Sequence, residues 1–376
     1  WPLWRCDARH SAATSQDLGD DLHLQWTLQL PPLKPAWPDE PRMRFDVAYE
    51  PIVAGQTLFL ASPREDALLA LDTRSAKLRW RFLADGPIRL APAVSDGRVY
   101  FGSDDGNLYC LKAADGALVW KFRAVPEERL VLGNERIIST WPVRGAPVVD
   151  KGRVYFAAGI WPFMGVFLYC LDASTGAVIW RKDDTGAVYF NQPHNSPAFS
   201  GAAPQGYLTA TDKVLLIPGG RSTPAGVNPD TGELLFFRLA ENHKIGDFKV
   251  AANATHFLNC GNLYQLTTGT LLGGVSSRPV TDPYVPFVSN PTLRIEPDSN
   301  ASVVTDDLLC GINKGEVVIR STAQAKMEES TDSKGNKSTN LVVPVSTATG
   351  IEADRVWLSA AGKLVASAGN RLLLIA

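Results

Sequence analysis

One stretch of this sequence occurs twice, and that repetition constrains the fold more than any other feature. Residues 98–120 read RVYFGSDDGNLYCLKAADGALVW, and residues 153–180 read RVYFAAGIWPFMGVFLYCLDASTGAVIW. Both copies place the same apolar runs, glycine turns and closing tryptophan in the same order. Repeats of this length are typical of chains whose units cannot bury their apolar faces alone and therefore stack on one another.

Each repeat predicts four short antiparallel strands. The runs VYF and LYCL alternate β-branched and aromatic residues, as strands do. Asp105-Gly106 lies between these runs and is a hairpin signal. Asp115-Gly116 supplies the next turn, and a fourth strand ends in Trp120. Four-stranded units that stack radially form a propeller, in which only short strand edges stay open.

The chain has room for seven such units. We therefore predict an all-β fold, a seven-bladed β-propeller with four-stranded antiparallel blades, as one domain over residues 1–376; eight blades are the alternative. The 31 Gly and 26 Pro are spread along the chain, which suits many short elements joined by turns. The predicted units are Asp46–Ala84, Gly86–Ala124, Ser139–Asp184, Asn195–Glu241, Gly246–Val280, Pro286–Ala323 and Asn340–Ala376.

Two segments do not follow the repeat in a simple way. Residues 1–45 form an N-terminal extension, in which residues 22–30 (LHLQWTLQL) look like a fourth strand with Trp26 matching Trp120. The last unit stops after its third strand, so we predict that this N-terminal strand completes the last blade. Residues 321–340 are polar and rich in Gly, Ser and Lys, which predicts a flexible surface loop.

The repeats VYFGSDDGNLYCLKAADGALVWKF and VYFAAGIWPFMGVFLYCLDASTGAVIW resemble the PQQ-type propeller repeat. Quinoprotein alcohol dehydrogenases carry this repeat, as does the propeller lipoprotein of the outer-membrane assembly machinery. The resemblance implies the propeller fold and a periplasmic or otherwise exported location. The sequence begins with Trp1 rather than Met, as after removal of a leader or trimming. The repeat is structural and implies no activity by itself.

The quinone-binding members that these blades resemble have further features: a vicinal Cys-Cys disulfide, a tryptophan beneath the quinone, a calcium or other metal ion, and a catalytic Asp. This chain has no Cys-Cys pair and no recognisable calcium ligand set, and Ser103–Asp105 reads as a hairpin turn. We therefore expect neither PQQ nor calcium, and no metal site. Cys110 and Cys170 hold the same place in successive repeats and are expected in the blade core.

A cluster of cationic residues is predicted at one mouth of the central channel, which the first strand of each blade lines. Alignment on the Pro that opens this strand places Arg89, Arg144 and His194 three residues before it on adjacent blades. Arg221 is expected to join them from a later blade, and Trp141 to form a wall. Arginine suits carboxylate, phosphate or sulfate, so the residues predict an anion site. The alternative is that each arginine pairs with a neighbouring Asp or a blade carbonyl.

The segment Gly159–Phe167 (GIWPFMGVF) interrupts the third unit where the second has a compact turn. Trp161, Phe163 and Met164 lie at or near its tip. Exposed apolar tips often mark contact surfaces, so these residues predict contact with a partner. The alternative is that they fold back over a neighbouring blade or over the channel mouth.

The first residues, WPLWRCDARHSAA, contain Trp1, Trp4, Cys6 and His10. Cys6 and His10 have a spacing that metal sites use, but two ligands are too few. Arg5, Asp7 and Arg9 are expected to tie the segment to the surface of the ring.

The remaining sequence features narrow the function. The net charge is −2, which argues against nucleic acid, and no apolar run is long enough for a membrane span. No nucleophile elbow, HExxH, P-loop or Rossmann pattern occurs, and no catalytic residue is predicted. We expect a non-catalytic binding or scaffold propeller of the bacterial envelope that recognises an anionic ligand, a glycan or a protein partner, or serves a fused enzymatic domain. The alternative is an enzyme acting on an acidic substrate at the Arg/His mouth, or a divergent quinoprotein dehydrogenase.

Overall fold

Strands dominate the part of the chain that the structure, a computed structural model, describes. The described residues are 1–16, 23–39, 45–133, 135–185, 188–191, 197–219, 222–238, 246–259, 262–274, 303–313, 316–331, 335, 337–342, 345–352, 355–358, 364–368 and 371–375. Within these ranges the only helical elements are two 3-10 turns, η2 (Pro162–Met164) and η4 (Thr322–Gln324). The predicted all-β class is therefore confirmed.

Antiparallel sheets follow one another along the chain, as the repeat predicts. The first two contain β1 (Ile52–Ala54), β2 (Thr57–Ser62), β3 (Ala67–Asp72) and β4 (Leu78–Leu83), then β5 (Ala93–Ser95), β6 (Arg98–Gly102), β7 (Asn107–Lys112) and β8 (Leu118–Arg123). The third contains β11 (Gly145–Asp150), β12 (Arg153–Ala158), β13 (Phe167–Asp172) and β14 (Val178–Lys182), with β17 (Gly206–Tyr207) added in parallel beside β11.

The later sheets are built in the same way. The fourth and fifth contain β18 (Thr209–Ala210), β19 (Leu215–Ile217), β20 (Ala225–Val227) and β21 (Leu234–Phe236), then β22 (Ala251–Ala252), β23 (His256–Asn259), β24 (Asn262–Gln265) and β25 (Leu271–Gly274). The sixth contains β26 (Val303–Val304), β27 (Leu308–Asn313), β28 (Glu316–Ser321) and β31 (Val345–Glu352), and the last contains β32 (Arg355–Leu358), β33 (Leu364–Ala368) and β34 (Arg371–Ile375).

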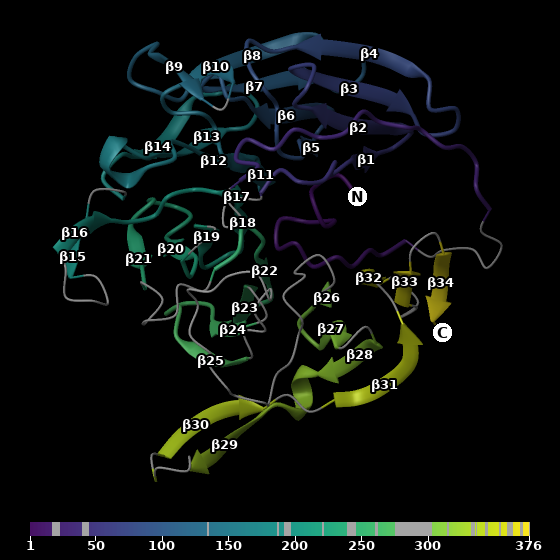
Figure 1. Cartoon of the computed structure of the whole chain (residues 1–376), viewed down its shortest axis with the longest axis vertical. Helices are drawn as coiled ribbons and strands as arrows, with labels where there is room; N and C mark the ends of the chain where they lie inside the picture. The colour runs from purple at the N-terminus through teal and green to yellow at the C-terminus, as the bar shows by residue number, and fades with distance from the viewer. Residues whose placement is uncertain are drawn as a thin grey trace.

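These sheets fan around a common centre, and the N-terminus lies inside the ring (Figure 1). This arrangement confirms the propeller. Seven sheets of this kind occur among the described residues, which leave out residues 275–302. The number of blades in the whole chain stays a prediction. Three separate hairpins extend from the ring: β9 (Leu130–Gly133) with β10 (Arg136–Ser139), β15 (Val188–Asn191) with β16 (Pro197–Ser200), and β29 (Lys326–Thr331) with β30 (Lys337–Val342).

The closing tryptophan and the glycine turn of the repeat form one contact between neighbouring blades. Trp80 donates its indole N–H to the carbonyl oxygen of Ala113 at 3.1 Å. A Cβ atom on Gly116 would lie 2.7 Å from the Trp80 ring, and Gly116 also has φ +73°. The turn must therefore carry glycine at this position, because the indole of the preceding blade lies directly against its backbone.

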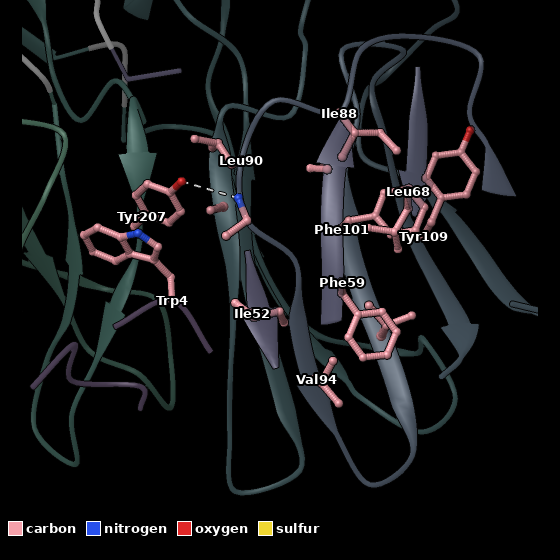
Figure 2. Close-up of a cluster of buried hydrophobic side chains, with 14 of the residues drawn as sticks. Trp4, Ile52, Phe59, Leu68, Ile88, Leu90, Val94, Phe101, Tyr109 and Tyr207 are labelled. Atoms are coloured by element: carbon pink, nitrogen blue, oxygen red, sulfur yellow. Dashed lines mark hydrogen bonds between the residues drawn. The ribbon is translucent and has the colours of Figure 1, made fainter. Parts of the chain in front are cut away.

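Apolar side chains fill the space between sheets. Phe101 and Tyr109 stack with centroids 5.1 Å apart, and Figure 2 shows them with Phe59 and Leu68 in the cluster between the first two sheets. Cys110 and Cys170 have no exposed surface, so their predicted place in the blade core is confirmed.

The prediction that residues 22–30 complete the last blade as a strand is wrong. The structure assigns no strand to residues 23–30, and the sheet β32–β34 has three strands. Trp26 nevertheless donates its indole N–H to the carbonyl oxygen of Thr73 at 2.8 Å, as Trp80 does to Ala113 one blade later. The segment thus docks on the first blade through its indole, without a backbone ladder.

Residues 321–340 were predicted to form a flexible loop, whereas the structure gives most of them regular structure; their flexibility stays a prediction. Most of these residues form η4 and the hairpin β29–β30, in which Lys326 pairs with Val342 and Thr331 with Lys337. The hairpin is inserted between β28 and β31, so the fourth strand of the sixth sheet comes from residues assigned to the seventh unit by sequence.

Candidate functional site

Two of the predicted channel-mouth cations share one carboxylate. Arg89 precedes β5, Arg144 precedes β11, and Asp104 lies in the turn between β6 and β7. Arg144 donates from Nε and Nη2 to the two carboxylate oxygens of Asp104 at 2.8 and 3.0 Å. Arg89 donates from Nε to Asp104 Oδ2 at 2.6 Å. The turn of the second blade therefore holds both arginines.

A second carboxylate completes this cluster. Arg89 donates from Nη1 to Asp46 Oδ2 at 2.8 Å, and the Ala36 backbone N–H donates to the same oxygen. The arginine side chains are 6% and 1% exposed, and both aspartates are 1% exposed. The cluster contains two positive and two negative side chains, so its formal net charge is zero. For these two arginines the geometry matches the alternative of pairing with a neighbouring Asp.

Burial and charge act in opposite directions on the two carboxyl groups. Burial disfavours the ionised form of Asp104, but the guanidinium groups of Arg144 and Arg89 outweigh it and hold its pKa below the usual value. Burial raises the pKa of Asp46 although Arg89 and Arg144 oppose this effect. Within the described residues, Arg144 Nη1 has no hydrogen-bond partner, and the guanidinium lies 4.9 Å from the Phe45 ring centre.

The other predicted ligand-binding residues are placed differently. His194 and Arg221 lie outside the described residues. Trp141 is buried, donates its indole N–H to the Met164 carbonyl oxygen at 2.6 Å, and packs edge-on against Phe167. It therefore ties the interrupting loop of the third blade to the blade itself. Binding of a ligand by these residues stays a prediction.

The interrupting loop of the third blade presents an apolar tip. Trp161, Phe163 and Met164 are 40%, 72% and 37% exposed. Trp161 packs edge-on against Trp37, with ring centroids 6.3 Å apart. The two ends of the loop lie close together at its base, since a Cβ atom on Gly159 would lie 2.5 Å from the carbonyl oxygen of Gly165. We call Trp161, Phe163 and Met164 the blade-three tip.

The N-terminal residues lie in the centre of the ring, not on its surface as expected. Backbone N–H groups on the first strands of several blades donate to carbonyl oxygens of this segment. The donor and acceptor pairs are Val53 to Trp1 (2.9 Å), Val94 to Pro2 (2.8 Å), Ala210 to Ala8 (2.8 Å), Ala252 to Arg9 (2.9 Å) and Val304 to Ser11 (3.1 Å). The segment enters the centre because the inner edges of β1, β5, β18, β22 and β26 would otherwise present unpaired N–H groups.

Side chains of the same segment are buried among the blades. The indole of Trp4 stacks on Tyr207 (Figure 2), and His10 Nδ1 lies 2.8 Å from the Val250 carbonyl oxygen and 2.9 Å from Thr209 Oγ1. Burial lowers the pKa of His10 to about 3, although the bond to Val250 opposes this, so the imidazole is neutral near pH 7. The missed signal in the sequence was a segment rich in aromatic residues but without any strand pattern.

The described residues contain no group of three or more His, Cys, Asp or Glu side chains placed to hold a metal ion. Four cysteines in those residues are free thiols: Cys6, Cys110, Cys170 and Cys310. No helix in the described part of the chain is long and apolar enough to cross a membrane.

Comparison with known proteins shows which proteins these repeats are similar to. The family described as outer membrane protein assembly factor BamB matches residues 23–140. The dehydrogenase subunit of the quinone-type alcohol dehydrogenase of Komagataeibacter europaeus is 32% identical over 180 residues, covering 44% of this chain and 22% of that protein. The tetrathionate hydrolase of Acidithiobacillus ferrooxidans is 25% identical over 228 residues, covering 55% of this chain and 40% of that protein.

Solved structures agree on the fold. A europium-containing methanol dehydrogenase superposes with a TM-score of 0.54 at 12% identity, covering 97% of this chain and 81% of that one. The chain spans about a fifth of the length of the quinone-type alcohol dehydrogenases it matches. The repeat, the sheets and these similarities together show a β-propeller fold. Residues 23–140 match the BamB family, and part of the chain is similar to quinone-type alcohol dehydrogenases.

Proposed function

We propose that this chain is a non-catalytic binding propeller of the bacterial envelope that recognises a protein partner through the blade-three tip. The observation that carries the proposal is the exposure of three large apolar side chains, Trp161, Phe163 and Met164, on a loop that the second blade lacks. Function is expected where the repeats differ, because the shared positions are used by the ring itself.

The tip has the properties of a preformed contact site. It connects β12 to β13, and the equivalent connection of the second blade carries Asp104, so both lie at the same end of their blades. Its position is held by the bond from Trp141 to Met164 and by packing of Trp161 against Trp37. An aromatic anchor that is already ordered loses little conformational entropy on binding.

The similarities favour a protein partner over a glycan or an anion. The matching family is described as an assembly factor of the outer membrane, which supports both a protein partner and an exported location for this chain. Arg89 and Arg144, the candidate anion ligands, are already paired with Asp104 and Asp46.

We further propose that binding uses neither PQQ nor calcium. The sequence lacks the adjacent cysteine pair of the quinone-binding members. Trp4 covers one face of Tyr207 in the centre of the ring, so no cofactor stacks on that face while the N-terminal segment is in place.

Site-specific photo-crosslinking in envelope fractions tests the proposed surface. A photoreactive residue at Phe163 should give a discrete protein adduct. The same residue at Leu24, which is 82% exposed and lies outside the tip, is the matched control and should give none. Equal adducts at both positions, or none at Phe163, would show that the tip is not the contact site.

One similarity favours a second candidate, an enzyme acting on an acidic substrate at the channel mouth. The alignment with tetrathionate hydrolase covers 55% of this chain, and tetrathionate is an anion. In this candidate Arg89, Arg144, His194 and Arg221 would bind the substrate beside Trp141. Turnover of tetrathionate by the wild type that is lost in Arg144→Lys would establish the enzyme and overturn the non-catalytic proposal.

A further inference from the structure

We propose that the centre of the ring is a peptide-binding site, which the chain's own N-terminal segment, Trp1–Ala13, occupies as an intramolecular ligand. When the covalent link is cut, the ring should release this segment reversibly and bind a peptide of the same sequence. This site is separate from the blade-three tip.

The main chain of the ring recognises main-chain groups of the segment. The first strands of five sheets each donate one backbone N–H, and the acceptors are carbonyl oxygens distributed from Trp1 to Ser11. Donors spread around a ring in this way match a ligand with carbonyls spaced along its length. A peptide satisfies this requirement, in the manner of peptides that add to open strand edges.

Two side chains of the segment anchor it. Trp4 stacks on Tyr207 with ring centroids 4.0 Å apart, and the hydroxyl of Tyr207 accepts from the Ala91 backbone N–H at 3.4 Å. His10 is bonded to Thr209 and to the Val250 carbonyl oxygen, and its ring meets the Trp4 indole edge-on at 4.7 Å. The preferred ligand therefore has an aromatic residue and a neutral imidazole six positions apart.

The conformation of the segment is that of a ligand ordered by its site. Four non-glycine residues have left-handed φ angles: Arg5 (54°), Cys6 (86°), His10 (59°) and Ala12 (54°). This conformation is unfavourable for residues that carry a Cβ atom. A free peptide would rarely adopt this path, so contacts with the blades must stabilise it together with bonds inside the segment.

Local bonds define the turn inside the segment. Asp7 Oδ1 accepts from the backbone N–H groups of Arg9 and Ser11 at 3.0 and 3.1 Å. Arg5 donates from Nε to the His10 carbonyl oxygen at 3.3 Å. The segment thus folds on itself at its centre, which presents Trp4 and His10 to the blades together.

The test uses the full chain, folded and then cut. A specific protease sequence replaces residues 17–22, and the purified protein is cleaved and passed over a sizing column. The cleaved segment should elute with the ring, and a fluorescent peptide of residues 1–16 should bind to the cut protein and displace it. Uncut protein should not bind the peptide, because its own segment occupies the site.

Variants separate recognition from nonspecific binding. A peptide carrying Trp4→Ala should bind the cut ring at least tenfold more weakly, because it lacks the stack on Tyr207. Leu24→Ser in the ring chain, an exposed position outside the centre, should leave the affinity unchanged. The proposal is wrong if the cut ring unfolds, if the segment never exchanges, or if the peptide and its Trp4→Ala form bind equally.

Discussion

The indole of Trp4 lies parallel to the phenol ring of Tyr207, with an interplanar angle of 9°. Tyr207 belongs to β17, which pairs with β11 of the third sheet, and its hydroxyl reaches the backbone at Ala91, just before β5. This one contact joins the start of the chain to two blades. The N-terminal segment, rather than the segment 23–30, is therefore the element that spans the ring from inside.

Trp4→Ala should destabilise the ring more than Trp26→Ala. Trp4 is 5% exposed, stacks on Tyr207 and meets His10 edge-on, so its loss should cost about 3 kcal/mol or more. Trp26 is half-buried on the outside and makes one indole bond to Thr73, so its loss should cost about 1–2 kcal/mol. Urea unfolding of both variants measures the difference. Equal losses would contradict a central role for Trp4.

His10 should make the stability of the protein fall at acid pH. The folded protein holds the pKa of His10 near 3 by burial, with Arg5 adding to the effect, whereas an unfolded histidine has a pKa near 6.5. Below pH 6.5 the unfolded chain therefore binds more protons than the folded chain. The free energy of unfolding should fall by up to about 1.4 kcal/mol per pH unit toward pH 3.

The variant His10→Asn provides the reference for this slope, because it removes the titrating group and leaves the acidic residues in place. Plotted against pH, the free energies of unfolding of wild type and variant should run parallel above pH 6.5. Below pH 6.5 the wild type should lose stability more steeply than the variant as the pH falls. Parallel curves down to pH 4 would show that His10 is not buried as a neutral imidazole.

Asp104→Asn should be strongly destabilising. The change leaves the buried guanidinium groups of Arg89 and Arg144 without their shared charge partner, which should cost about 3–5 kcal/mol. Lys151→Ala is the control, since its ion pair with Asp212 is exposed and should contribute little. Chemical denaturation measures both. A small effect of Asp104→Asn would mean that the arginines do not depend on this carboxylate.

The same cluster allows a direct test of anion binding. If Arg89 and Arg144 form only the paired arrangement, sulfate and phosphate should not raise the melting temperature beyond their general salt effect. A specific rise that disappears in Arg144→Ala would support the predicted anion site. A rise that survives the change would place the anion elsewhere.

Gly116→Ala and Gly97→Ala should differ although both glycines have φ +73°. A Cβ atom on Gly116 would lie 2.7 Å from the Trp80 ring, whereas one on Gly97 would have nothing within 4 Å. Both variants carry the cost of a left-handed alanine, and Gly116→Ala should lose about 1–3 kcal/mol more from the clash. Equal melting temperatures would show that the indole moves aside freely.

The repeat was sufficient to predict the strands and their order, but not the contact of Trp80 with the turn at Gly116 in the next blade. The pattern of Trp120 and Gly116 carries this information because strand alternation and turn geometry are local properties. The sequence left open whether Arg89 and Arg144 pair with Asp104. An aspartate in a hairpin turn does not indicate which neighbouring blade supplies its partners. Asp46 was missed for the same reason.

The amino-acid sequence by itself determined the four-stranded blade, because the first three units each contain short apolar runs, turn glycines and a closing tryptophan within about forty residues. Only the tertiary structure decided what lies in the middle of the ring. The segment Trp1–Ala13 has no periodic pattern, and its place depends on open N–H groups of five sheets that meet only when the ring is formed. A blade can be predicted from the local sequence pattern. The position of the N-terminal segment cannot, because its hydrogen-bond donors come from several blades.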